Sequence, residues 1–144
     1  MPNNTMCQSL LILLFCFFSS TTSAETSIAI NGLSKHFNTP LVRNPYNIGI
    51  GYIRNSHELG LYRNSRRSTS HSIYYTWNKH VINLKKISLG YRLGGAIYDD
   101  ALHYNAFLKP IIAGYVDIPV SKKIDFRVTG TYNLIGAQLL YNFK

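Results

Sequence analysis

Three residues of this chain could together carry out nucleophilic acyl transfer. Ser65 supplies a hydroxyl, His36 supplies an imidazole, and Asn64 supplies an amide directly before the serine. In such a site the imidazole takes the hydroxyl proton and the third group orients the ring. We therefore single out His36, Asn64 and Ser65 as candidate catalytic residues. The alternative is that they are ordinary polar residues of a solvated rim.

Charged residues in the same polar segments suggest two further sites. A phosphate-bearing substrate could be held bidentately by three arginines, namely Arg43, Arg66 and Arg67. The alternative is a general basic rim. A hard divalent cation could be held by Asp99, Asp100 and His103, but three ligands within one loop are a weak signal, so no metal or cofactor site is predicted.

The elements that must position these residues are β-strands. In the segment 45–65, PYNIGIGYIRNSHELGLYRNS, large apolar residues alternate with small or polar ones. Tyr46, Ile48 and Ile50 lie on one face of the expected strand, and Gly49 and Gly51 lie on the other. Because a soluble sandwich fills its inner face with large aliphatic residues, this pattern instead indicates a barrel with bulky residues outside and room inside.

The whole chain shows eight such segments, each of about ten residues. They are 26–37, 45–55, 58–65, 70–79, 84–97, 107–118, 123–132 and 134–143. This number and length predict an all-β fold, an eight-stranded antiparallel transmembrane β-barrel. A soluble periplasmic barrel would need the opposite facing and ranks last. Connections of alternating length predict outer loops that contain the candidate site, although the one near Tyr132-Asn133 is short.

The amino-terminal segment predicts export. Leu10–Phe18 is an unbroken apolar run of nine residues, followed by small residues up to Ala24. We expect residues 1–24 to be a cleaved signal peptide and residues 25–144 to be the barrel. The formal net charge of +9 suggests an anionic partner, and after export lipopolysaccharide fits better than nucleic acid, for which no motif is present. We therefore predict a monomer in the bacterial outer membrane.

Alternation also assigns residues to the lumen and to the turns. A polar interior network is expected from Arg92, Asp125, Arg127 and Gln138. Lysines are expected to flank the periplasmic turns, namely Lys79, Lys85, Lys86, Lys122 and Lys123, and His57 and His80 are expected in turns as well. In a simple register His36 and Ser65 point toward lipid, unless a bulge at Asn31-Gly32 and fraying at Asn64 turn them inward.

Several short stretches resemble small outer-membrane barrels related to the lipid A palmitoyltransferase family. They are 31–37 (NGLSKHF), 44–47 (NPYN) leading into Gly49 and Gly51, 60–65 (GLYRNS), 88–91 (SLGY) and 110–115 (PIIAGY). The resemblance implies an eight-stranded barrel that moves a palmitoyl chain from phospholipid to lipid A. His36 and Ser65 stand at the positions of the family's His and Ser, whereas Asn64 stands where the family has Asp.

Two functional hypotheses follow from these residues. The first is an acyltransferase that moves a fatty acyl chain from phospholipid to lipid A. The second is a barrel without chemistry, an adhesion, resistance or structural protein whose outer loops bind a partner. Analysis of lipid A from cells with and without the chain distinguishes them.

Overall fold

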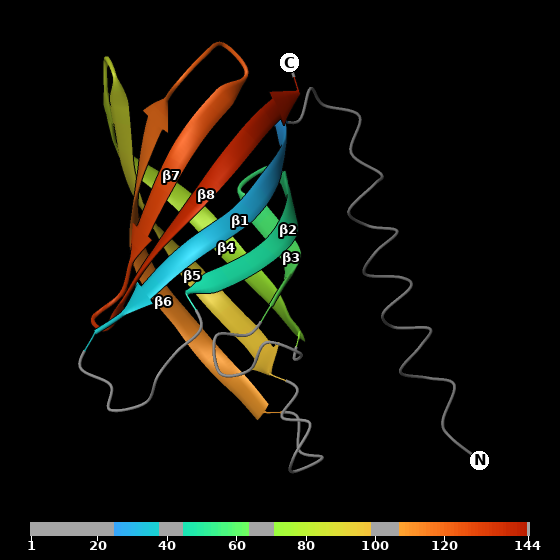
Figure 1. Ribbon diagram of the computed structural model, residues 1–144. Coiled ribbons are helices and arrows are strands. Elements are labelled where there is room, and N and C mark those ends of the chain that lie inside the picture. Colours follow the sequence, from blue (N-terminus) through green and yellow to red (C-terminus); the bar gives the residue numbers. More distant parts are fainter. Residues whose placement is uncertain (1–24, 38–44, 64–70, 99–106, 144) are drawn as a thin grey trace.

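The computed structural model describes residues 25–37, 45–63, 71–98 and 107–143, which form a closed antiparallel β-barrel (Figure 1). The eight strands are β1 (Thr26–His36), β2 (Tyr46–Arg54), β3 (His57–Arg63), β4 (His71–Leu84), β5 (Ile87–Tyr98), β6 (Phe107–Pro119), β7 (Ile124–Gly130) and β8 (Leu134–Phe143). Each strand pairs with the next, and β8 pairs with β1 to close the ring. The predicted eight-stranded fold is thereby confirmed. The predicted signal peptide, residues 1–24, lies outside the described residues.

The two ends of the barrel differ in their connections. One end, called the turn end below, has the short connections 55–56, 85–86 and 120–123. The first and last strands also meet there, since Thr26 pairs with Phe143. The opposite end, the loop end, has the connections 37–45, 64–70, 99–106 and 131–133. At the turn end, Asn55 and Ser56 have φ angles of 48° and 73°, as the tight primed turn of a two-residue hairpin requires.

The barrel has apolar side chains on its outer face and polar side chains in its interior, the reverse of a soluble barrel. Large apolar residues point outward, and Ile48 and Ile112 are 63% and 72% exposed. Polar residues point inward, and the side chains of Glu58 and Thr76 are fully buried. Alternation along a strand produces this sorting, because successive side chains lie on opposite faces. The outer surface therefore has the character of a barrel that contacts lipid.

Inner glycines make room for one large residue in the lumen. Gly51 and Gly60 face inward, as the sequence predicted for Gly51, and Tyr74 on β4 lies against both, with its hydroxyl at Gly51 and its ring at Gly60. A Cβ on Gly60 would come within 2.6 Å of two Tyr74 ring carbons. The glycines thus allow Tyr74, which is 4% exposed, to reach the buried centre of the barrel.

The largest difference from the predicted strand boundaries is at the end of β4. β4 continues to Leu84 instead of ending near residue 79, because a register shift between His80 and Ile82 lets the β4–β5 ladder run on to Leu84 and Ile87. The predicted turn residues His57 and His80 therefore lie in strands, where His57 pairs with Trp77 and His80 pairs with Gly90. No helix in the described part of the chain is long and apolar enough to cross a membrane.

Candidate functional site

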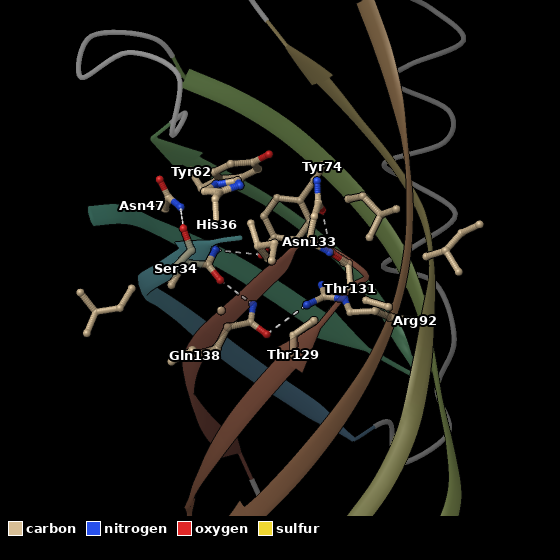
Figure 2. Close-up of a pocket in the computed structure, with 18 of the residues that line it drawn as sticks. Ser34, His36, Asn47, Tyr62, Tyr74, Arg92, Thr129, Thr131, Asn133 and Gln138 are labelled. Carbon is tan, nitrogen blue, oxygen red and sulfur yellow. Dashed lines mark hydrogen bonds between the residues drawn. The ribbon is translucent and has the colours of Figure 1, made fainter. Parts of the chain in front are cut away.

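The loop-end half of the barrel contains a cavity of about 640 Å³. Figure 2 shows Ser34, His36 and Asn47 on one side of this cavity and Thr129 and Arg92 on the other. Its apolar lining comes from Ile111, Ala113, Leu134 and Ala137 and, where the cavity reaches the outer face, from the exposed residues Leu33, Pro110 and Ile112. Cavities of this size and character are typical of sites for small organic ligands.

A bulge in β1 turns His36 into this cavity. The pairing of β1 with both neighbours shifts between Asn31 and Leu33, at Gly32. Before the shift the inward residues are Ala29 and Asn31, and after it they are Ser34 and His36. The simple register, in which His36 points toward lipid, is therefore wrong, and the bulge at Asn31-Gly32 accounts for the difference.

Hydrogen bonds order the residues around His36. Asn47 on β2 donates a hydrogen bond from its amide to the hydroxyl of Ser34 on β1. Phe37, directly after His36, donates its backbone N–H to the carbonyl oxygen of Asn133 at 2.8 Å. The bond from Phe37 connects the end of β1 to the turn between β7 and β8. Hydrogen bonds to β2 and to the β7–β8 turn therefore hold the segment of β1 that contains His36.

The floor of the cavity is a buried network centred on Glu58. The Glu58 carboxylate accepts hydrogen bonds from the hydroxyl of Tyr74 at 2.6 Å, from Arg92 Nη2 at 3.0 Å and from Gln138 Nε2 at 3.1 Å. Arg92 Nη1 in turn donates to Gln138 Oε1 at 3.1 Å. Arg127 Nη1 lies 3.6 Å from the same carboxylate. This network fills the lumen below the cavity, so the cavity opens away from the turn end.

A second ion pair continues the network toward the turn end. Asp117 accepts hydrogen bonds from Arg127 Nε at 2.6 Å and from Arg127 Nη2 at 2.8 Å, in the bidentate geometry that arginine favours. His80 Nε2 lies 3.1 Å from the same carboxylate. Two arginines and two carboxylates, those of Glu58 and Asp117, thus balance their formal charges inside the barrel.

The interior network differs from the predicted one in its acids. Arg92, Arg127 and Gln138 take part as expected, but Asp125 does not belong to this centre. Asp125 accepts a hydrogen bond from Asn142 at 2.7 Å nearer the turn end. Glu58 was missed although it alternates with Leu59 and Leu61 in the expected strand 58–65, because its position next to a turn gave no sign of its central place.

One side of the cavity wall is incomplete. β6 pairs with β7 only from Gly114 to Pro119, and β7 ends at Gly130. Among the described residues, no strand pairs with 107–113 of β6 on that side. This unpaired edge is about 23 Å long. It includes Pro110, which has no N–H to donate and is tolerated at a strand edge. Within the described ranges, no strand closes the side of the cavity between β6 and the β7–β8 turn.

Most of the predicted site residues lie outside the described residues. These are Arg43, Asn64, Ser65, Arg66, Arg67, Asp99, Asp100 and His103. Of the candidate catalytic residues only His36 is described, and the approach of His36 to Ser65 stays a prediction. No group of three or more His, Cys, Asp or Glu side chains suited to a metal ion occurs in the described ranges.

Two polar residues beside His36 were not predicted as part of a site. Asn47 faces inward on β2, and the alternation of β2 in the sequence could have predicted this facing. Alternation did not predict the inward facing of Ser34, because the bulge reverses the facing of the residues that follow it.

Comparisons with known proteins are limited to the fold. No family model matches the chain, and no curated protein matches it. One similar solved structure is that of Ail, the attachment invasion locus protein of Yersinia pestis, in complex with the heparin analogue sucrose octasulfate. The two chains are 18% identical with a TM-score of 0.40, over 83% of this chain and 97% of that chain. At this identity and TM-score the likeness is distant.

Proposed function

We propose that this chain is a monomeric bacterial outer-membrane β-barrel whose loop end faces the outside of the cell. Its apolar outward residues, such as Ile48 and Ile112, support this placement because lipid covers them without cost. Closure of the barrel also supports it, since paired strands satisfy backbone groups that water does not reach in a bilayer. Short connections at the turn end match the periplasmic turns of such barrels.

The cavity is proposed to bind an acyl chain of a membrane lipid, either lipopolysaccharide or a phospholipid. One observation carries this proposal: a cavity of about 640 Å³ with a largely apolar lining lies beside the β6–β7 gap, where no described strand closes its side. Unpaired backbone is costly in hydrocarbon, so the open edge of β6 fits best near the lipid headgroups of the outer leaflet. An acyl chain could enter there from the side while its headgroup stays in the polar region.

The first candidate function is lipid binding without chemistry, as in an adhesion, resistance or structural barrel. This function requires only the cavity and the apolar outer surface, and it does not depend on a catalytic serine. The loop arginines Arg43, Arg66 and Arg67 would add contacts to lipid phosphates in this function.

The second candidate function is acyl transfer, and the inward facing of His36 favours it. In this mechanism the imidazole of His36 takes the proton of the Ser65 hydroxyl while the serine oxygen attacks the ester carbonyl of the donor lipid. The same imidazole then returns the proton to the departing alcohol. Asn64 would orient the ring. A hydroxyl oxygen of lipid A would then attack the acyl-serine carbonyl while His36 takes its proton, and His36 would return this proton to the departing Ser65 oxygen, which transfers the acyl group and restores the serine.

Filling the cavity tests the lipid-binding proposal. Gly136 on β8 lines the cavity, and a Cβ there meets only ordinary contacts, with the Leu33 carbonyl oxygen at 3.7 Å and Leu134 Cδ2 at 3.8 Å. The Gly136→Leu variant should therefore fold and occupy the cavity. Gly130→Leu is the matched control, because a Cβ at Gly130 meets nothing within 4 Å and Gly130 does not line the cavity.

The measurement is the amount of co-purified lipid per folded barrel, determined by native mass spectrometry. Gly136→Leu should lower it strongly and Gly130→Leu should leave it unchanged. Equal lipid content in the wild type and in folded Gly136→Leu would show that the cavity does not hold the lipid.

A further inference from the structure

Two hairpins at the turn end carry the same short sequence pattern. The β4–β5 tip reads Leu84-Lys85-Lys86-Ile87, and the β6–β7 tip reads 120–124, VSKKI. All four tip lysines are exposed. In both hairpins a pair of lysines is thus flanked by large aliphatic residues, and neither the fold nor the cavity accounts for this repetition.

The two tips are neighbours in the barrel. β5 and β6 stay paired up to Ser88 and Asp117, close to the end of each strand. Figure 1 shows both tips at the top of the molecule, with the β6–β7 tip in orange and the β4–β5 tip in yellow-green. The extended β4 contributes to this arrangement, because it runs past Trp77, its last partner position with β3, as far as Leu84. The four lysines at these two adjacent tips are called the tip lysines below: Lys85, Lys86, Lys122 and Lys123.

The charge of the tip lysines is not compensated within the described part of the chain. The described ion pairs involve only His80, Arg92 and Arg127 as cations. At this end Asp117 pairs with Arg127 and His80, Asp125 accepts a hydrogen bond from Asn142, and Glu25 takes part in none of the described ion pairs. Four exposed lysines on two adjacent hairpin tips make this end of the barrel positively charged, which favours an anionic partner.

The surface that leads to the tip lysines is apolar. Leu84 and Val120, directly next to the tips, are 55% and 65% exposed, and Ile118 and Ile124 are also exposed. A long lysine side chain can cover such a surface with its methylene groups while the ammonium group reaches the polar side. An acidic protein would match only the charge of the lysines. A lipid with an anionic headgroup matches both the charge of the lysines and the apolar surface beside them.

We propose that the tip lysines bind the phosphate headgroups of anionic phospholipids in the leaflet at the turn end. The apolar flanks contact the acyl chains of these lipids, and the ammonium groups contact the phosphates. The proposal relies on the membrane placement given under Proposed function, but it is independent of the cavity and of acyl transfer. Its consequence is that this side of the barrel is anchored at a defined depth.

Selective retention of lipid tests the proposal. The full barrel is folded in detergent micelles with equal amounts of phosphatidylglycerol and phosphatidylcholine, and native mass spectrometry gives the ratio of the two lipids that stay bound. Each lysine near an anionic surface should contribute roughly a fivefold preference. The pair variants Lys85→Ser/Lys86→Ser and Lys122→Ser/Lys123→Ser should therefore each lower the ratio by roughly tenfold or more.

Two controls separate charge from position and from shape. Replacing all four tip lysines by arginine keeps the charge and should keep the ratio near the wild-type value. Replacing two exposed cations at the loop end, Lys35→Ser with Arg63→Ser, should lower the ratio much less than either tip pair.

Each of the following outcomes would overturn the lipid proposal. A folded wild type without preference for phosphatidylglycerol, or tip variants with an unchanged ratio, would overturn the lipid proposal and leave the membrane placement intact. An equal loss in the loop-end control would assign the effect to net charge and also overturn it. Recovery of the wild type in the soluble periplasmic fraction of cells would overturn the membrane placement and this proposal with it.

Discussion

Removing the charge of Glu58 should destabilise the barrel strongly. Glu58 is fully buried, with Arg92 Nη2 at 3.0 Å and Arg127 Nη1 at 3.6 Å. Glu58→Gln keeps the shape of the side chain but leaves two buried arginines with one carboxylate, that of Asp117. Loss of one partner of a buried ion pair costs about 3–5 kcal/mol. We expect a decrease of that size in the free energy of unfolding.

A double-substitution cycle tests the reason for this effect. Arg92→Gln should also be destabilising, but Glu58→Gln combined with Arg92→Gln restores the balance of charge inside the barrel. The double variant should therefore be more stable than the sum of the single effects predicts, by roughly 0.5–3 kcal/mol. Asp125→Asn is the control, because it removes a carboxylate that has a hydrogen bond to Asn142 outside the central network and should cost about 1 kcal/mol.

The assay is reversible urea unfolding of the barrel in lipid vesicles, followed by the fluorescence of Trp77, the single tryptophan of the chain. Heat-modifiable mobility in detergent gels checks that each variant folds. A Glu58→Gln barrel within about 1 kcal/mol of the wild type, or strict additivity with Arg92→Gln, would refute the idea that charge balance holds the interior together.

Three further predictions concern the wall, the turn and the candidate site. Gly49→Leu should reduce folding yield sharply, because a Cβ there would lie 2.5 Å from Tyr62 Cα, whereas Ile50→Leu on the outer face should be nearly silent; equal sensitivity would contradict the assigned facing. Ser56→Gly should raise the free energy of unfolding by up to about 1 kcal/mol by relieving a φ of 73°, and urea midpoints that fall instead would argue against strain at this turn. His36→Ala and Ser65→Ala should each leave a folded barrel and cut acyl transfer by orders of magnitude, and together they should cost little more than either alone. Mass spectrometry of lipid A measures the transfer, and lipid A that is identical with and without the wild type would leave only the binding function.

Local alternation was enough to predict the strands and the facing of most residues. Gly49 and Gly51 face inward and Ile48 and Ile50 face outward as expected, because successive residues of a strand always point to opposite faces. The count of eight strands followed from the same local signal. The polar connection near Tyr132 also marked the end of β7 to within two residues.

The tertiary structure decided the features that depend on distant partners. The sequence left open whether β1 has a simple register or a bulge at Asn31-Gly32, and only the pairing of β1 with β2 and β8 decided for the bulge, which reverses the facing of Ser34 and His36. The central place of Glu58 depends on residues from β4, β5, β7 and β8 that come together only in the closed barrel. The gap beside β6 results from the early end of β7, a mismatch between two strands that neither sequence segment shows alone. Periodicity is a property of one strand, whereas register, ion pairing and openings belong to several strands at once, and a single sequence does not contain their relative positions.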